Sequence, residues 1–192
     1  MKIAILGCGA YGIALSEMFS LNNCSITMWT KFEDELLDLK KNRTNTRVLP
    51  NFKINNNIEF TTDLKEAISG KNLIVIAIPV KFVSPIILEL KGIIKKSQHI
   101  CIASKGIEQG SLLFINSIIK KHIHTKKIAV ISGGSFAVDM IRHVPIGLSL
   151  ATKNFQTEKL ILKSLQNKYL RLIPTKDIFG VEMYGAIKNV IA

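Results

Sequence analysis

Three glycines near the start of the chain have a spacing that suits either a bound nucleotide or an ordinary turn. Gly7, Gly9 and Gly12 form a G-x-G-x-x-G pattern within the stretch ILGCGAYGIAL. Glycines in this pattern allow a tight turn and a close approach of the backbone to a pyrophosphate at the start of the next helix. Because glycine is common in turns of all kinds, the pattern is informative only between a strand and a helix.

The residues around the glycines predict both of these elements. Residues 2–6 are β-branched or apolar and predict a buried strand, and residues 11–21 have the pattern of a packed helix. Residues 25–30 predict a second strand. Strand, glycine turn, helix and strand therefore follow in the order that a dinucleotide-binding unit requires, and a dinucleotide site is favoured.

The same alternation continues along the chain. Strands alternating with helices form a parallel sheet through right-handed crossovers. The predicted fold class is therefore α/β, with a Rossmann-type, doubly wound and mainly parallel sheet. Further strands are predicted over 73–78, 100–103, 128–132, 146–151 and 169–173, and helices over 34–41, 82–90, 112–121, 157–166 and from 177 onward.

Ligands of such a sheet bind beyond the carboxyl ends of its strands. Four segments lie at that end or beside it in the predicted arrangement: 78–80, 104–108, 132–137 and 185–189. A single residue such as Lys105 is more often a solvated lysine than a functional one. Several candidate segments at one end of the same sheet favour a site.

The end of the second strand bears on which dinucleotide is bound. An acidic residue at this place binds the adenosine ribose and favours NAD. Here the strand ends with Trp29-Thr30-Lys31, and the first carboxylates after it are those of Glu33 and Asp34. Lys31 is either a partner for the 2′-phosphate of NADP or a solvated loop lysine. We expect NADP to be preferred, with NAD tolerated.

The composition disfavours several other classes of protein. With 192 residues, 47% hydrophobic and 21% charged, the chain has the size of one folded domain, or of one domain and the beginning of another. Its three cysteines have no C-x-x-C spacing, so neither a disulfide framework nor a metal site is expected. The net charge of +12 is spread along the chain and aromatics are only 7%, so nucleic acid is not an expected partner.

Neither a signal peptide nor a membrane span is predicted. The apolar start contains glycines and lacks a clear cleavage site, and no later apolar stretch reaches the roughly 18 residues that a span requires. A cytoplasmic location is the expectation. The apolar helical pattern over 181–192 stops without a glycine cap or a polar tail, which predicts the N-terminal part of a longer protein.

Six segments in this order resemble the N-terminal portion of the bacterial NAD(P)-dependent sn-glycerol-3-phosphate dehydrogenases. The most specific of them contains G-A-x-K-N on a helix between domains, which is not a general feature of dinucleotide-binding folds. The segments are GCGAYGIAL (7–15), NTRVLP (45–50), AIPV (77–80), SKGIE (104–108), SGGSFAVDM (132–140) and GVEMYGAIKNVIA (180–192).

The resemblance implies roles for individual residues. Lys188 is the implied catalytic acid/base, assisted by Lys105, and substrate contacts are implied for both lysines and for Gly133 and Ser135. The implied cofactor-binding residues are Gly7, Gly9, Ala10, Tyr11, Gly12, Lys31, Pro79, Lys105 and Ala137.

Members of the family reduce dihydroxyacetone phosphate to sn-glycerol 3-phosphate, a phospholipid precursor. Negative charge builds on the ketone oxygen, and a lysine ammonium can stabilise that charge and deliver a proton if its pKa is lowered. A second lysine nearby lowers it by like-charge repulsion. The resemblance also implies a Rossmann domain over 1–178, the start of an interdomain helix over 179–192, a further all-helical substrate domain, and possible homodimers.

Departures from the family pattern leave alternatives open. Val48, Val80 and Gly134 stand where the family usually has Tyr, Ser and Pro, and the family's substrate-phosphate residues lie beyond residue 192. Cofactor binding without turnover is therefore expected of this chain. The alternatives are a non-catalytic or decayed dinucleotide-binding fragment, and a related two-domain hydroxyacid dehydrogenase. The SKGIE and GAIKNVIA segments disfavour the second.

Overall fold

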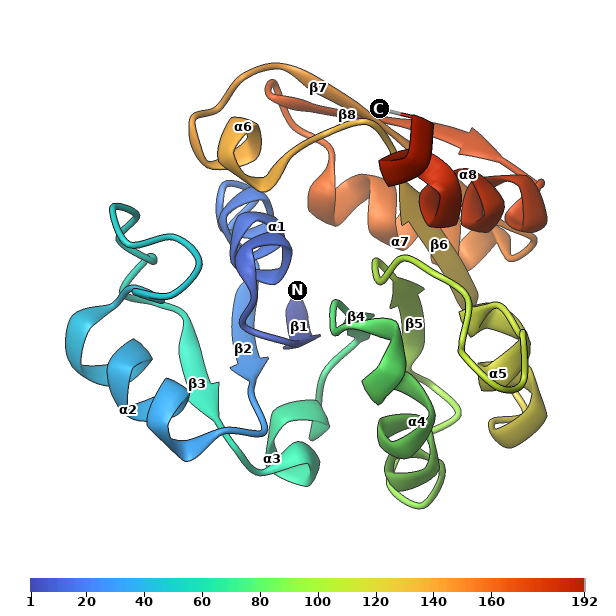
Figure 1. The fold of residues 1–192 in the computed structure, drawn as a ribbon, viewed down its shortest axis with the longest axis horizontal. Coiled ribbons are helices and arrows are strands. Elements are labelled where there is room, and N and C mark those ends of the chain that lie inside the picture. Colours follow the sequence, from blue (N-terminus) through green and yellow to red (C-terminus); the bar gives the residue numbers. More distant parts are fainter. Residues whose placement is uncertain (192) are drawn as a thin grey trace.

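One eight-stranded sheet organises the molecule, in the order β3-β2-β1-β4-β5-β6-β7-β8 (Figure 1). The computed structural model describes the backbone of residues 1–191 and the side chains of residues 1–187. The strands are β1 (Lys2–Leu6), β2 (Ser25–Trp29), β3 (Glu59–Thr61), β4 (Leu73–Ile76), β5 (His99–Ile102), β6 (Ile128–Ser132), β7 (Ile146–Thr152) and β8 (Leu170–Thr175).

Helices cover both faces of the sheet. Those that contribute to one core are α1 (Ala10–Ser20), α2 (Glu33–Asn42), α6 (Ala137–Ile141) and α7 (Phe155–Leu165). Those that contribute to the other are α3 (Leu64–Ile68), α4 (Val83–Lys91), α5 (Ile115–His122) and α8 (Ile178–Ile191), and a short 3₁₀ turn η1 (Val80–Phe82) precedes α4.

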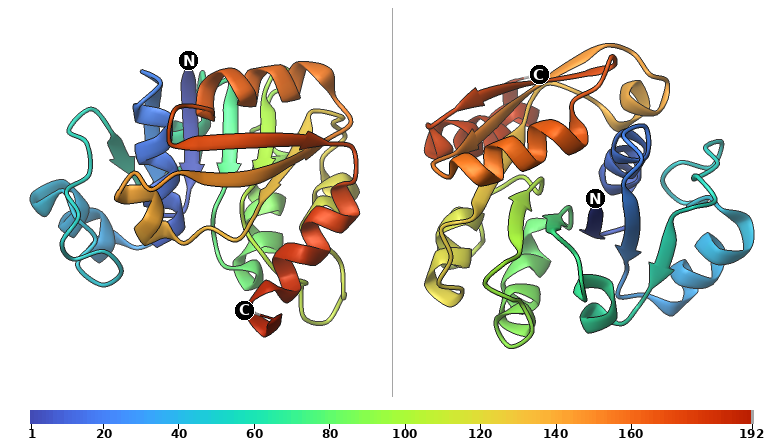
Figure 2. Two further views of the ribbon diagram at one scale, coloured as in Figure 1. Left: turned by 90° about the horizontal axis from the view of Figure 1, so that it is seen from above. Right: turned by 180° about the vertical axis from the view of Figure 1, so that it is seen from behind.

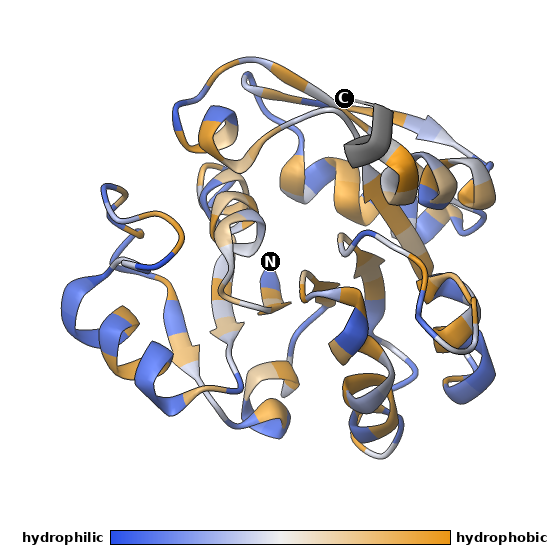
Figure 3. Cartoon of the chain, viewed as in Figure 1, coloured by the Kyte–Doolittle hydropathy of each residue, from blue (hydrophilic) through white to orange (hydrophobic). Residues whose placement is uncertain are grey.

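The strands are apolar on both faces because each face is covered. In β1, Ile3 and Ile5 belong to the core on one face, and Ala4 and Leu6 belong to the core on the other. Figure 3 shows the consequence, since the central strands are coloured as hydrophobic whereas α2 is mostly hydrophilic. A continuous apolar run with this double burial is typical of a parallel sheet, and it explains why these strands were predictable.

The strand register brings the candidate segments to one edge. Leu6 pairs with Trp29 on one side and with Ile76 on the other, so the residues after β1, β2 and β4 leave the sheet together. Beyond β4, Ile76 pairs with Ile102, which extends the same edge to β5. Because the chain turns from β1 outward to β2 and later returns to β4, the crevice between these strands is the topological switch point of the fold.

The mainly parallel sheet is confirmed, with one antiparallel pair that the sequence did not indicate. β7 runs antiparallel to β6, with Ile131 opposite Leu150, and then pairs in parallel with β8 along one edge of the sheet (Figure 2). Parallel neighbours need a crossover that carries the chain back along the sheet. The connection between β6 and β7 holds only the five-residue helix α6, so β7 begins where β6 ends.

The short elements β3, α3, α6 and η1 were missed, and several boundaries moved. β3, α3 and α6 have three, five and five residues, which is too short for a hydrophobic period to show. The helix expected over 112–121 begins at Ile115, since Leu112 has a left-handed φ of 55°. Along the part of the chain that the structure describes, no helix combines the length and apolar character needed to cross a bilayer.

Candidate functional site

Two glycines of the turn are required by the packing of the protein itself. Gly7 has a φ of +117°, and a Cβ there would lie 2.5 Å from the carbonyl oxygen of Ala77 at the end of β4. A Cβ on Gly12 would lie 2.2 Å from the carbonyl oxygen of Gly7. These positions give the tight turn after β1 and the close packing of α1 against it, as the fingerprint requires.

No packing contact within the described protein requires a glycine at position 9. A Cβ on Gly9 would meet nothing within 4 Å, and the residue is exposed. Gly9 caps α1 without a side-chain hydrogen bond, and the described first turn of α1 contains no acidic residue. The amide groups and the positive end of the helix dipole therefore face open space, which is the arrangement that binds a phosphate anion.

A cavity of about 250 Å³ lies beside this turn. Its walls come from the ends of three neighbouring strands: Gly9 after β1, Lys31 after β2 and Pro79 after β4. Phe82 and Ile86 complete the apolar side. The cavity thus occupies the switch-point crevice in which a dinucleotide binds to an open α/β sheet.

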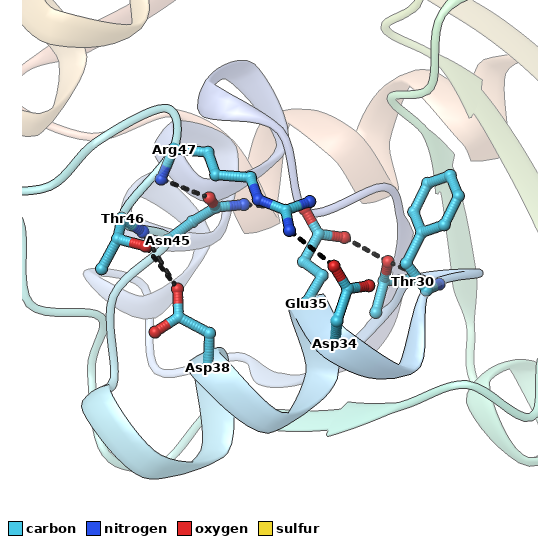
Figure 4. A network of polar contacts seen from close by, with 8 residues as sticks. Thr30, Asp34, Glu35, Asp38, Asn45, Thr46 and Arg47 are labelled. Carbon is cyan, nitrogen blue, oxygen red and sulfur yellow. Dashed lines mark hydrogen bonds and ion pairs between the residues drawn. The ribbon is translucent and has the colours of Figure 1, made fainter.

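A fixed polar network lines the β2 side of this cavity (Figure 4). The buried hydroxyl of Thr30 donates to Oε2 of Glu35, and Nδ2 of Asn45 donates to Oε1 of the same carboxylate over 2.7 Å. The same amide group donates to the carbonyl oxygen of Cys8 in the glycine turn over 2.9 Å. Lys31 was predicted here from the sequence and Glu35 was not, although the place of Glu35 in the first turn of the helix after the second strand was a usable signal.

The second part of the site lies at the ends of β5 and β6. Nζ of Lys105 donates to the carbonyl oxygen of Gly133 over 3.4 Å and lies 5.1 Å from the centre of the Tyr11 ring. Lys105 follows β5, Gly133 follows β6, and Tyr11 stands in the first turn of α1. Three segments far apart in the sequence therefore meet beside the glycine turn, and α8 lies against them through Gly185.

The hydroxyls of Tyr11, Ser132 and Ser135 are buried in this region, and none makes a hydrogen bond of standard geometry to a described residue. Those of Tyr11 and Ser135 lie close enough to interact with each other. Burial raises the pKa of Tyr11 to about 12, with the nearby Ser135 hydroxyl acting in the opposite direction. Tyr11 is thus a neutral phenol at physiological pH. Buried polar groups are normally paired, and an unpaired one costs roughly 1–3 kcal/mol, so buried hydroxyls without good partners favour a polar ligand at this place.

The structure describes some of the remaining predicted residues and not others. Gly133 is required by packing, because a Cβ there would lie 2.9 Å from the backbone carbonyl oxygen of Gly147. Ala10 and Ala137 are the first residues of α1 and α6, and both are half-buried. The prediction for Lys188 falls on a side chain outside the described residues. No group of three or more metal-ligating side chains is found among the side chains that are described.

The open helix terminus, the empty space over Gly9 and the unpaired hydroxyls fit a dinucleotide with a polar substrate beside it. Comparison with known families gives the same answer. The family described as NAD-dependent glycerol-3-phosphate dehydrogenase N-terminus matches residues 2–158. The chain belongs to this family.

Curated relatives of the family match the entire chain. Glycerol-3-phosphate dehydrogenase [NAD(P)+] of Leptospira biflexa is 34% identical and is covered over 59% of its length, and that of Fusobacterium nucleatum is 34% identical and is covered over 58%. The crystal structure of glycerol-3-phosphate dehydrogenase from Coxiella burnetii superposes with a TM-score of 0.93 at 28% identity, over 99% of this chain and 58% of that one. The chain therefore spans less than two thirds of the length of these relatives.

Proposed function

We propose that this chain is the cofactor-binding part of an enzyme that reduces dihydroxyacetone phosphate to sn-glycerol 3-phosphate with NAD(P)H. The observation that carries the proposal is the open N-terminus of α1 at Gly9, which faces the switch-point cavity and has no partner of its own among the described residues. Membership of a glycerol-3-phosphate dehydrogenase family supports glycerol 3-phosphate as one of the two reactants and a nicotinamide dinucleotide as the cofactor.

Each of the chain's own residues has a defined task in this reaction. The cofactor, when bound, supplies the hydride. The first-turn amides of α1 and the gap over Gly9 hold its pyrophosphate. Lys105, anchored on the carbonyl oxygen of Gly133, orients the substrate carbonyl and stabilises negative charge on its oxygen. Ser135 offers an unpaired hydroxyl to the substrate, and Lys188 delivers the proton.

The proposal extends to the cofactor preference, the domains and the assembly of the protein. Lys31 lies at the cavity wall on the β2 side, where a cation attracts the 2′-phosphate of NADP. Residues 1–178 form the cofactor domain, and residues 179–192 begin the helix that leads to an all-helical substrate domain. The protein acts in the cytoplasm, on a small-molecule substrate, as a homodimer.

Calorimetric titration of the 192-residue chain with NADPH and with NADH tests the first half of the proposal, and an absorbance assay with dihydroxyacetone phosphate tests the second. Binding with turnover supports the complete reaction. Binding without turnover supports a cofactor domain that needs the substrate domain for activity. If neither dinucleotide binds, the chain is a decayed relative and the proposal is wrong.

The catalytic assignments need a chain that turns over. In the longer protein, or in this chain if it is active, Lys188→Ala should abolish turnover and leave cofactor affinity nearly unchanged. Turnover retained by that variant would contradict the assignment of Lys188 as the acid. Lys105→Met should instead weaken both turnover and substrate affinity, because Lys105 contacts both ligands in this scheme.

A further inference from the structure

Two opposite charges stand in the wall of the switch-point cavity, and among the described residues that line it they are the only charged ones: Lys31 and Glu35. We propose that the balance between these two charges sets the preference for NADP over NAD, with Glu35 as the residue that opposes the 2′-phosphate. This inference rests on the proposed function, because it concerns the cofactor that the cavity holds.

The carboxylate of Glu35 is held in one position. Thr30, directly after β2, donates its hydroxyl to one oxygen, and Asn45 donates its amide to the other (Figure 4). Asn45 is itself fixed on the carbonyl oxygen of Cys8. Both oxygens are engaged by neutral donors, and Glu35 forms no ion pair among the described residues.

The neighbouring charges are already paired with other groups or lie outside the cavity. Asp34 and Arg47 form an ion pair at 2.5 Å, with both side chains well exposed. Glu33 accepts a hydrogen bond from the Thr62 hydroxyl over 2.7 Å and does not line the cavity. Asp38 contacts Thr46. Arg47 also attracts Glu35 electrostatically, but it does not line the cavity, so Lys31 and Glu35 are the two charges in the described wall itself.

The two charges act differently on the two cofactors. The hydroxyls of the adenosine ribose in NAD can donate to a carboxylate, whereas the 2′-phosphate of NADP is repelled by it. A lysine ammonium has the opposite preference, and it attracts the phosphate as a point charge. Because the cavity wall contains both a carboxylate and an ammonium group, both cofactors are accepted. The preference for NADP is then set by how far the attraction of Lys31 for the 2′-phosphate exceeds its repulsion by Glu35.

Acidic residues in the first turn of a helix also stabilise the helix dipole, which is the ordinary reason for a glutamate at this place. In α2 that turn contains Glu33, Asp34 and Glu35. Only Glu35 of the three lines the cavity and is half-buried, whereas the other two are exposed. Glu33 therefore provides a matched control with the same charge, the same helix turn and no access to the cofactor.

The chain carries its own probe for the test. Trp29 is the single tryptophan of the sequence and lines the cavity, so its emission should respond to bound NADH or NADPH. We would titrate the 192-residue wild type, Glu35→Gln, Lys31→Gln and Glu33→Gln with both cofactors, and with 2′,5′-ADP and 5′-AMP as fragments without nicotinamide. Thermal unfolding of each variant checks the fold, and Glu35→Ala is made in parallel in case Gln is not accommodated.

The expected result is a change in the ratio of the two dissociation constants. Glu35→Gln should tighten NADPH and 2′,5′-ADP roughly tenfold, as expected for removing one unit charge several ångströms from a phosphate in a partly solvated cavity. It should weaken NADH about threefold, because a charged hydrogen bond becomes a neutral one. Lys31→Gln should lower the affinity for NADPH roughly tenfold and leave the affinity for NADH within about twofold of the wild-type value.

An unchanged NADPH-to-NADH ratio in Glu35→Gln and Glu35→Ala overturns the inference, as does a change no larger than that caused by Glu33→Gln. These results leave the proposed function standing, since wild type still binds. Failure of wild type to bind either cofactor or either fragment overturns the proposed function itself, and the inference with it.

Discussion

Single residues in the glycine turn show why one sequence pattern has two meanings. Gly7 and Gly12 are glycines because backbone atoms of the protein occupy the space of a side chain, whereas the space beside Gly9 is empty of protein. The first two therefore serve the fold, and we propose that Gly9 serves a ligand. A pattern of three glycines cannot by itself separate these cases, because the reason for each lies in what the rest of the chain brings near it.

This difference predicts opposite results for two equal substitutions. Gly12→Ala should destabilise the protein by about 2 kcal/mol or more, because the added Cβ would collide with the Gly7 carbonyl. Gly9→Ala should leave the melting temperature within a few degrees and weaken NADPH binding about tenfold or more. Denaturant unfolding and calorimetric titration of both variants give the comparison. Equal loss of stability in the two would contradict a ligand role for Gly9.

At the scale of elements, the site depends on how closely α8 approaches β6. A Cβ on Gly185 of α8 would lie 2.7 Å from Oγ of Ser132, the last residue of β6, and 3.7 Å from Cγ of Lys105. The glycine thus allows the helix to lie directly over the end of the strand. This contact fixes the helix against the loop that carries Lys105.

Gly185→Ala should therefore lower the free energy of unfolding by about 1–3 kcal/mol, because the new methyl group overpacks the contact. Ser132→Ala alone should be neutral or slightly stabilising, since it removes a buried hydroxyl without a partner. In the double variant the nearest side-chain atom is then Cβ of residue 132 at 3.6 Å, an ordinary contact, so part of the loss should be recovered. Strictly additive effects in denaturant unfolding would show that the two residues do not touch.

A second element-scale contact predicts a pH dependence. Glu182 of α8 is buried, and its Oε1 accepts a hydrogen bond from the backbone N–H of Asn116 in the first turn of α5 over 2.8 Å. Burial raises the pKa of this carboxyl above its usual 4.5, and the hydrogen bond from Asn116 opposes the change. The folded protein therefore holds a proton at Glu182 at pH values where the unfolded chain has lost it.

This difference in bound protons determines how the free energy of unfolding changes with pH. The stability that the protonated carboxyl contributes is complete below pH 4.5 and is lost as the pH rises through the higher folded pKa. Glu182→Gln keeps an acceptor for the Asn116 N–H and has no such loss, so it should gain stability relative to wild type between pH 4 and pH 8. Chemical unfolding at several pH values measures this. A stability difference that does not vary with pH would contradict the raised pKa.

At the scale of the whole molecule, the formal charge of +12 acts on any anionic ligand. Dinucleotides are anions, and a positive protein field raises the rate at which they arrive without specifying where they bind. This gives the basic composition a consequence that does not involve nucleic acid.

Stopped-flow measurement of Trp29 emission should show that NADPH associates several-fold more slowly in 0.5 M salt than in 0.02 M salt, because salt screens the field. The decrease should be larger for NADPH than for NADH, since NADPH carries the additional phosphate. The dissociation rate constant provides the internal control, because steering affects it little. Association that does not depend on salt would exclude a role for the net charge.

The sequence alone determined the α/β class, the order of the long strands and the position of the glycine turn. These depend on local causes: buried strands are apolar on both faces, as in β1, and a turn at Gly7 with positive φ needs glycine. Neighbouring residues carry this information, so it can be read along the chain. It also pointed to Lys31 and Lys105, which lie at the cavity wall and beside Gly133 in the folded protein.

Only the tertiary structure decided what meets at the sheet edge. The antiparallel β7, the placement of Glu35 between Thr30 and Asn45, and the three unpaired hydroxyls of the Lys105 region depend on contacts between residues far apart in sequence. Short elements such as β3 and α6 likewise form because the packed sheet holds them, and not because of their own patterns. Burial and unpaired polar atoms are properties of the assembled core, so no local pattern in the sequence contains them.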